Sequence, residues 1–501
     1  MTDLAALLDE AALRAAVDAD LDSPSRQLPP SIVSPALQAR RDEVAAWALG
    51  RIGGAFVPTP EEVVPVSKAG HGMRPVAVWD LPSRLAYRAL ADRLRPGLPP
   101  VDRGNAAYRV FLRAPLAEGP RYVVASDITA CYEQIDHALL SAELVAQTGD
   151  HAAVDAIAWL LRSAGGRAYG LPQQSPASDL LADAFLRRLE RALVRRGLKV
   201  SRYNDDFRFA CGSWSDVSRS VEILASEART LGLTVNELKT VTWGAAKYTA
   251  HLDEADRLRQ EIADEAEIDL TQYDQEYDGT VVAEPPTQEQ IDAHSSVLVL
   301  ERWARVAGRG RVAQTRRTEH RAVLDLLPAA LDRLSADTQT DAHVLDLCNR
   351  LLRFERTTTP AVAAYLTTRN DVDVLGSFYR LLKAKPYLNG WQTWWLQQPT
   401  TRHAGFATGS GAKARVEWAR AALVAADHTP VLRAHAALVL ARHSKVGEAE
   451  LLGIYDRSSV TVRPVVAAAV ALLQPSAAVR DAVTGDSALN RWSYEWAELF
   501  G

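Results

Sequence analysis

The sequence predicts an α+β domain in the first half of the chain and an all-α domain in the second. In the first half, short β-branched runs such as RYVVAS (121–126) alternate with helical stretches that end on glycine. Beyond residue 292 the strand patterns disappear, and short amphipathic helices follow one another with brief polar turns between them. A length of 501 residues exceeds what one hydrophobic core usually supports, so we expect at least two domains.

Composition narrows the class of protein. An apolar content of 48% and a charged content of 24% are ordinary for a soluble globular protein, and no apolar run is long enough to predict a membrane span. The acidic, helical N-terminus fits neither a secretory signal nor a transit peptide, so we expect a cytoplasmic protein with no membrane partner. Three widely spaced cysteines exclude a disulfide framework and disfavour a structural zinc site.

Two hairpins frame the predicted strands of the first half. After an N-terminal helical segment (1–60), EEVVPVSK and MRPVAVWD flank AGHG, which predicts a hairpin with a glycine turn. Helices are predicted after RYVVAS and over SPASDLLADAFLRRLERALVRRG. LKVSRY and FRFACG flank Asn204-Asp205-Asp206 as a second hairpin, and LTVNELKTVTW predicts a further strand.

The second half is predicted to be a series of short helices. Residues 264–292 are acidic, polar and interrupted by Pro-Pro, which is typical of a linker or a long insertion. The helices beyond them come in pairs, several starting at proline, without a sustained heptad pattern. This favours a HEAT-type α-solenoid, with an irregular helical bundle as the alternative because the repeat pattern is loose.

Any attraction to nucleic acid must come from local basic patches, because the net charge is −5. The run 187–202 has seven basic residues against one acid, and the run 302–321 has seven arginines against one glutamate. Each run is equally compatible with a solvated helix face. We expect the second run to line a channel for template or product, through a group of four arginines: Arg309, Arg311, Arg316 and Arg317.

Three aspartates are candidates for a metal site. Phosphoryl transfer to a 3′-hydroxyl uses two divalent cations about 3.5–4 Å apart, and such hard cations prefer carboxylates. Asp127 follows a predicted strand, and Asp205-Asp206 stands at the tip of a predicted hairpin. Neighbouring strands of one sheet would bring them together. Taken singly, an Asp-Asp pair is more often turn chemistry and one Asp after a strand is commonly a helix cap.

Five sequence blocks in fixed order make the combination specific. They are KAGHGMRPVAVWDLPSRLAYRAL (68–90), DITACYEQIDH (127–137), GLPQQSPASDLLADAFL (170–186), RYNDDF (202–207) and LGLTVNELKT (231–240). Over roughly residues 60–245 the sequence resembles the reverse transcriptases, closest to the bacterial group that includes group II intron, retron and abortive-infection enzymes.

The resemblance implies an α+β right-hand polymerase (fingers-palm) followed by an all-α helical-repeat (HEAT-like) domain. The expected boundaries are fingers and palm over 61–245, a thumb-like segment and acidic linker over 246–292, and the helical repeats over 293–501.

The resemblance also implies catalytic roles. Asp127 and Asp205 would ligate two Mg²⁺ ions, for which Mn²⁺ may substitute, with the Ile128 carbonyl as a further ligand. Asp206 is expected to be the less essential partner. Lys239 would donate a proton to the departing pyrophosphate, although a lysine at the end of a strand is ordinary at a protein surface.

Four further residues are expected to bind the nucleotide. Lys68 and Arg74 flank the first hairpin and would clamp the triphosphate, with surface charge as the alternative. Tyr132 stands where these enzymes keep a bulky aromatic against the sugar, which argues for deoxynucleotides; the alternative is a core tyrosine. Gln173 lies in the block under the templating base pair. Gln174 stands where the family usually has glycine, which puts ordinary templated copying in doubt.

A polymerase followed by helical repeats resembles the abortive-infection and unknown-group reverse transcriptases of antiphage defence. Three hypotheses follow: a defence DNA polymerase working without template or with protein priming, a templated retron-like enzyme dependent on a noncoding RNA, and a non-enzymatic RNA-binding scaffold. The intact aspartates count against the scaffold. The expected partners are deoxynucleotide triphosphates, RNA or DNA, a noncoding RNA in the retron-like case, and further copies of the chain as a homo-oligomer.

Overall fold

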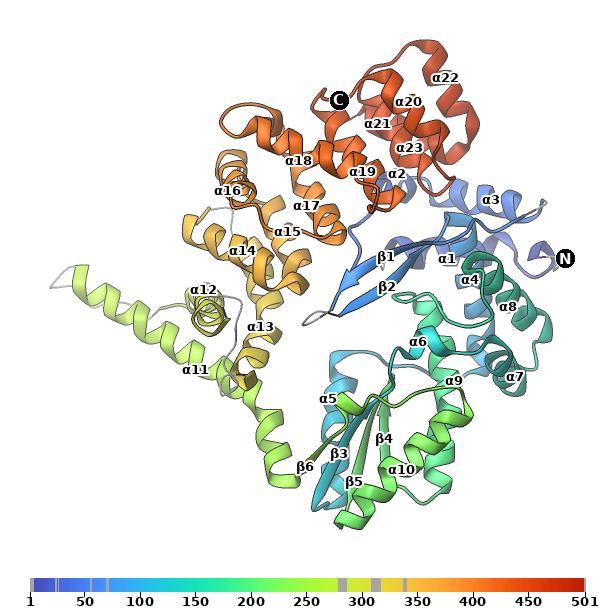
Figure 1. Cartoon of the computed structure of the whole chain (residues 1–501), viewed down its shortest axis with the longest axis vertical. Helices are drawn as coiled ribbons and strands as arrows, with labels where there is room; N and C mark the ends of the chain where they lie inside the picture. The colour runs from blue at the N-terminus through green and yellow to red at the C-terminus, as the bar shows by residue number, and fades with distance from the viewer. Residues whose placement is uncertain are drawn as a thin grey trace. The chain divides into compact units, whose positions relative to one another are not determined.

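The chain divides into two compact units, which Figure 1 shows in a computed structural model. The first unit comprises residues 1–25, 34–63 and 75–252, and the second comprises 26–33, 64–74 and 253–501. The structure describes residues 4–22, 25, 27–54, 56–68, 72–277, 286–307, 317–336 and 340–499. None of the helices in these ranges is both long enough and apolar enough to span a membrane.

The first unit holds the strands of a small sheet among helices. Its helices are α1 (Glu10–Asp22), α2 (Ser34–Gln38), α3 (Arg41–Ile52), α4 (Leu81–Leu94), α5 (Asn105–Arg113), α6 (Cys131–Gln134), α7 (His137–Thr148), α8 (His151–Gly165), α9 (Pro176–Arg195) and α10 (Trp214–Thr230). Its short 3₁₀ turns are η1 (Leu4–Ala6), η2 (Arg95–Gly97), η3 (Ala114–Glu118) and η4 (Glu237–Lys239). Its sheet strands are β3 (Tyr122–Asp127), β4 (Val200–Tyr203), β5 (Asp206–Cys211) and β6 (Val241–Gly244).

The sheet is antiparallel, in the order β4-β5-β3-β6. β5 alternates buried and half-buried residues, with Phe207 and Phe209 facing the core, as expected for a strand covered on one face. Helices α9 and α10 pack against the sheet strands. β6 is shorter than the predicted strand, because the turn η4 interrupts the LTVNELKTVTW segment before Val241.

Helix α4 is the core helix of the first unit. Asp80 caps its N-terminus by accepting a hydrogen bond from the Ser83 amide at 3.0 Å, and Pro82 stands in its first turn. The helix packs against α1, α3, α8 and α9, so its apolar residues lie on several faces and not on one stripe. The Tyr87 hydroxyl and the Ser178 hydroxyl, 3.0 Å apart, join α4 to α9.

A two-stranded hairpin, β1 (Glu62–Ser67) and β2 (Met73–Val78), stands where the sequence predicts it. Residues 64–74 belong to the second unit, where the Asn389 side-chain amide donates to the buried Ser67 hydroxyl at 2.8 Å.

The second unit is otherwise helical over its described residues. Its helices are the greater part of α11 (Ala245–Tyr277), then α12 (Gln288–Ala307), α13 (Arg317–Ala336), α14 (Ala342–Phe354), α15 (Thr359–Thr367), α16 (Asp371–Lys383), α17 (Gly390–Arg402), α18 (Ala412–Val424), α19 (Pro430–Arg442), α20 (Glu448–Asp456), α21 (Arg463–Ala471), α22 (Ala477–Asp486) and α23 (Ala488–Glu498). Two 3₁₀ turns, η6 (Arg356–Thr358) and η7 (Ala404–Ala407), lie between them.

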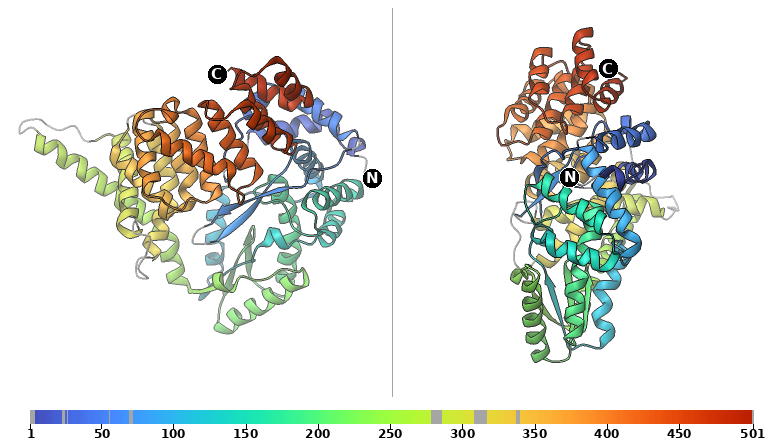
Figure 2. Two further views of the ribbon diagram at one scale, coloured as in Figure 1. Left: turned by 45° about the horizontal axis from the view of Figure 1, so that its top comes forward. Right: turned by 90° about the vertical axis from the view of Figure 1, so that its right-hand side faces the viewer.

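The helices from α12 to α19, together with α21 and α23, form two layers, in each of which a helix packs on the next but one along the chain. One layer runs α13, α15, α17, α19, α21, α23, and the other runs α12, α14, α16, α18. Figure 2 shows the same succession from yellow to red. The inner helices α19 and α21 are buried along nearly their whole length, so their sequences are apolar on every face. The expected fold class, a polymerase-like α+β domain followed by all-α helical repeats, is confirmed.

The predicted linker is wrong for residues 264–277, which continue the helix α11. Ile262 and Ala266 are buried, so this stretch has an apolar side. Its acidic charge has partners in α12: Glu265 lies 3.9 Å from Arg302 and 3.7 Å from Arg305. Sequence composition alone cannot show that neutralisation. Residues 278–285, which include the first proline of the Pro-Pro pair, lie outside the described residues.

Buried His435 of α19 predicts a pH-dependent stability of the helical unit. Burial lowers its pKa to about 4, whereas an unfolded histidine titrates near 6.5. A lowered pKa means that the unfolded chain takes up the proton first, so stability is complete above pH 6.5 and is lost as the pH falls towards 4. His435→Gln should therefore reduce the difference in unfolding free energy between pH 7 and pH 5 by about 2 kcal/mol.

The measurement is denaturant unfolding of the full chain at the two pH values. His343, whose side chain is 54% exposed, supplies the control His343→Gln. Equal pH dependence in both variants would show that His435 is protonated at no cost in the folded chain.

Candidate active site

The three predicted aspartates lie together on adjacent strands of the sheet. Asp127 is the last residue of β3 and Asp206 the first of β5, and the two are directly paired in the antiparallel register. Asp205 precedes β5 in the hairpin turn, and its carbonyl accepts a hydrogen bond from the Ile128 amide at 3.2 Å. The backbone of Ile128 is therefore tied to the same turn. The ends of the two predicted strands therefore meet at the same end of the sheet.

Burial makes this concentration of negative charge costly. The pKa of Asp205 is raised to about 6, first by burial and then by the charge of Asp127. The pKa of Asp206 is raised as well, again chiefly by burial, while Arg208 acts in the opposite direction from 3.5 Å. The Lys239 ammonium lies 2.8 Å from Asp127 Oδ2. Cations are thus already drawn to two of the three carboxylates.

The donor set fits divalent magnesium. Carboxylate and carbonyl oxygens are the ligands that hard cations prefer, and the raised pKa of Asp205 shows that its charged form lacks compensation. Within the described ranges, no three acidic, histidine or cysteine side chains, the three aspartates included, converge closely enough to form a metal site as they stand. Lys239, whose side chain is 64% exposed, occupies Asp127 Oδ2 and can move away into solvent. Asp127, Asp205, Asp206 and the Ile128 carbonyl are therefore the groups that would hold the ions.

Two of the resembling blocks are joined by backbone hydrogen bonds. The His137 ring Nε2 donates to the Gly170 carbonyl at 2.7 Å, and the Gly170 amide donates to Ile135 at 2.8 Å. The Leu171 amide donates to the Tyr132 carbonyl at 2.7 Å. The Ile-Asp-His sequence thus has structural roles: Ile135 is buried, Asp136 caps α7, and His137 holds the loop that leads to Gln173.

Tyr132 is half-buried and its hydroxyl is fixed. It donates to Asp179 Oδ1 at 2.6 Å and accepts from Arg103 Nη1 at 2.8 Å. Burial raises the pKa of Tyr132, so the hydroxyl stays protonated. A ring held at its far end cannot swing aside, which suits a residue that limits space for a sugar.

The loop after α8 contains Gln174, which stands where the resembling family usually has glycine. The side-chain amide of Gln173 donates from Nε2 to Glu133 Oε1 at 3.0 Å. Gln174 has φ of +64°, in the left-handed region that favours glycine. The backbone therefore keeps a glycine-like conformation although the side chain has changed.

The remaining predicted residues lie in the second unit or outside the described residues. Lys68 and Arg74 belong to the second unit, and their role at the triphosphate stays a prediction. Arg309, Arg311 and Arg316 lie outside the described residues, while Arg317 begins α13 with an exposed side chain.

In the other basic run, 187–202, five of the seven basic residues are paired with acids. Arg187 contacts Asp183, Arg191 contacts Glu143, Arg196 contacts Glu227, Lys199 contacts Glu118, and Arg202 contacts both Asp183 and Glu190.

Sequence reasoning missed several residues around the aspartates. The Asn236 side chain donates to Asp127 Oδ2 at 3.3 Å, and its own Oδ1 accepts from the Lys239 amide. An asparagine three residues before Lys239 is a capping pattern that could have been recognised. Arg208 follows Asp206 by two residues on a strand, so both point to the same face. Arg103 and Asp179 had no such signal, because they meet only in the folded chain.

The antiparallel sheet with carboxylates at paired strand ends has the arrangement expected of a polymerase palm. Residues 66–254 match the family "Reverse transcriptase (RNA-dependent DNA polymerase)". The chain therefore contains a reverse transcriptase domain over these residues. The comparison with curated proteins gives no match.

Among solved structures, telomerases show a remote similarity. Apo telomerase from Candida tropicalis without its C-terminal domain is 14% identical, with a TM-score of 0.27, over 37% of this chain and 49% of that one. The fuller apo form is 12% identical, with a TM-score of 0.30, over 74% of this chain and 68% of that one. Telomerase from Candida albicans with the TWJ fragment of telomeric RNA is 11% identical, with a TM-score of 0.29, over 72% of this chain and 64% of that one. This chain thus spans about half the length of the first, and scores this low carry no argument.

Gln174→Gly should stabilise the folded chain by about 1 kcal/mol, because glycine adopts a positive φ without the penalty that a side chain incurs. Gln174→Ala is the matched control, since it removes the polar side chain but keeps the Cβ atom. The measurement is denaturant unfolding of both variants. If alanine stabilises as much as glycine, the side chain and not the backbone is the source of the strain.

Proposed function

We propose that the chain is a DNA polymerase that adds deoxynucleotides by two-metal phosphoryl transfer. The observation that carries the proposal is the pairing of Asp127 with Asp206, with Asp205 beside them, in a partly buried site within the matched residues 66–254. Asp127, Asp205 and Asp206 would hold two Mg²⁺ ions, which would activate the 3′-hydroxyl and neutralise charge on the triphosphate. Mn²⁺ is the expected substitute.

The protein's own groups hold and select the substrate. Asp127 and Asp205 provide fixed negative charge, and Asp206, already close to Arg208, is the weaker partner. Lys239 stands at the site with an exposed side chain paired with Asp127, and it is proposed to donate a proton to the leaving pyrophosphate. Lys68 and Arg74 are proposed to clamp the triphosphate, and Gln173 to lie under the nascent pair.

Asp205→Asn should reduce nucleotide incorporation by orders of magnitude while the fold persists, because it removes one ligand charge and no volume. Asp155→Asn is the matched control, since Asp155 is exposed on α8. Incorporation is measured with labelled deoxynucleotides in Mg²⁺, and folding by thermal unfolding. Undiminished activity of the Asp205 variant would contradict the two-metal proposal.

Tyr132 is proposed to exclude the 2′-hydroxyl. Tyr132→Val opens the space that the ring fills, so the ratio of kcat/KM for deoxynucleotides over ribonucleotides should fall by about tenfold or more. Tyr132→Phe keeps the ring and should keep most of the preference. If valine leaves the ratio unchanged, the ring is core packing and the preference for a DNA product loses its basis.

The biological setting we propose is antiphage defence of the abortive-infection type, with synthesis that needs no template or starts from a protein hydroxyl. Two features support it: the polymerase unit is followed by layered helices, and Gln174 replaces the family's glycine under the nascent pair. RNA, DNA and further copies of the chain are the proposed partners, in the cytoplasm. A templated enzyme dependent on a noncoding RNA is the alternative, and sequencing the nucleic acid that copurifies with the chain distinguishes the two.

A further inference from the structure

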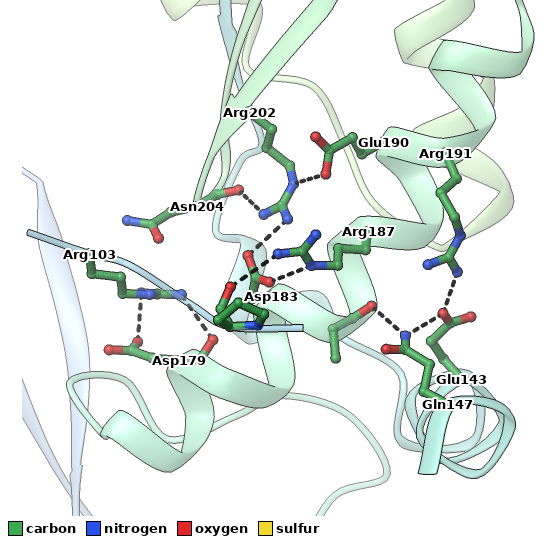
Figure 3. Close-up of polar contacts among 12 residues, drawn as sticks. Arg103, Glu143, Gln147, Asp179, Asp183, Arg187, Glu190, Arg191, Arg202 and Asn204 are labelled. Carbon is green, nitrogen blue, oxygen red and sulfur yellow. Dashed lines mark hydrogen bonds and ion pairs between the residues drawn. The ribbon is translucent and has the colours of Figure 1, made fainter. Parts of the chain in front are cut away.

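Arg202 lies beneath the hairpin turn that carries Asp205 and Asp206. It belongs to β4, two residues before Asn204, and its side chain is only 4% exposed. Figure 3 shows its guanidinium directed at three acceptors. Nη1 donates to the Asn204 carbonyl at 2.9 Å, Nη2 to Asp183 Oδ1 at 2.8 Å, and Nε to Glu190 Oε2 at 3.1 Å.

The turn itself needs such support. Tyr203 and Asp206 are paired, so Asn204 and Asp205 are the two central residues of a tight turn. Asn204 has φ of +54°, a conformation that costs a non-glycine residue free energy even though asparagine tolerates it best. The hydrogen bond from Arg202 to the Asn204 carbonyl offsets that cost and fixes the direction of the peptide that leads into Asp205.

The guanidinium is held from the other side by helix α9. Asp183 and Glu190 lie seven positions apart, on one face of that helix, and each accepts from Arg202. Asp183 also accepts from Arg187 at 2.9 Å, so its two oxygens receive two arginines. Only arginine offers permanent charge with donors in three fixed directions, whereas a lysine ammonium is a single point.

The same helix face reaches the nucleotide-binding tyrosine. Asp179, one turn before Asp183, accepts from the Tyr132 hydroxyl and pairs with Arg103 at 2.8 Å. The acidic row of α9 therefore ties the hairpin turn and the segment of Tyr132 to one helix. Its members are Asp179, Asp183 and Glu190. The spacing between the carboxylate-bearing turn and the ring is set by the rise of α9.

We propose that Arg202 is a positioning residue for the catalytic turn, and that the acidic row of α9 holds this turn and Tyr132 at a fixed separation. The proposal rests on the proposed polymerase function for its kinetic consequences. Arg202 touches neither substrate nor metal in this scheme. It acts through the Asn204 carbonyl on Asp205 and Asp206, which must stand within a fraction of an ångström of their working positions.

Arg202→Lys tests the proposal, because it keeps the positive charge between Asp183 and Glu190 but loses the three-directional contact. In Mg²⁺, kcat should fall by about tenfold or more while KM for the deoxynucleotide stays within about twofold, since the turn and not the binding groups is disturbed. Hydrogen exchange of peptides covering residues 203–206 should become faster, which is a readout independent of activity.

Arg191→Lys is the matched control. Arg191 lies on α9, the helix that carries Asp183 and Glu190. It pairs with Glu143, a buried carboxylate of α7, away from the turn (Figure 3). It should leave both kcat and the exchange of 203–206 unchanged. The proposal is overturned if the two variants behave alike, or if Arg202→Lys keeps the wild-type kcat in an active enzyme. If the wild-type chain incorporates no nucleotide, the proposed function fails instead, and the exchange measurement still decides the role of Arg202.

Discussion

The constraint on which the rest of the structure depends is the crowding of three carboxylates, one buried and two half-buried, at the ends of adjacent strands in a small sheet. Register alone sets Asp127 opposite Asp206, and the hairpin turn adds Asp205 beside them. In a site of low dielectric such charges repel each other and lose solvation, which is why the pKa of Asp205 rises. A fold selected for stability alone would have placed apolar residues there. Arg208 and Lys239 reduce this electrostatic cost, and so would the divalent ions that the donor set fits.

The positive groups near the turn divide by how firmly they are held. Arg202 is buried and fully engaged by α9 and the turn, so it can shape the site but cannot leave it. Arg208 is also largely buried and lies 5.1 Å from the Phe111 ring centroid. Lys239 is exposed and held through one contact to Asp127. A mobile cation beside a metal ligand can exchange places with an ion, and the two arginines cannot. In the function proposed above, the two arginines would position the carboxylates, and the flexible Lys239 would act on the substrate.

The sequence predicted the strands, the hairpins and the meeting of the aspartates, because each depends on local pattern and on sheet register. The resembling blocks were sufficient to place Asp127, Asp205, Asp206, Tyr132 and Lys239 in one unit. What it could not predict were contacts between segments distant along the chain. Arg103 and Asp179 are 76 residues apart and carry no local signal of pairing. The basic run 187–202 looked open for the same reason, since its partners Glu118, Glu143 and Glu227 come from other elements.

The same lesson bears on the second basic run and on what the helical unit does. Its crowding of seven arginines suggested an external polyanion. Yet Arg302 lies 2.8 Å from Glu319, and both Arg302 and Arg305 approach Glu265 of α11, in the stretch that looked like an acidic linker. Acidic and basic runs that seemed to be separate features neutralise each other inside one unit. The electrostatic case for a nucleic-acid channel therefore cannot count Arg302 and Arg305, whose charge is matched inside the unit. These two arginines of α12 should contribute little to any salt dependence of nucleic-acid binding, because counterions are released only where the protein has not already supplied its own.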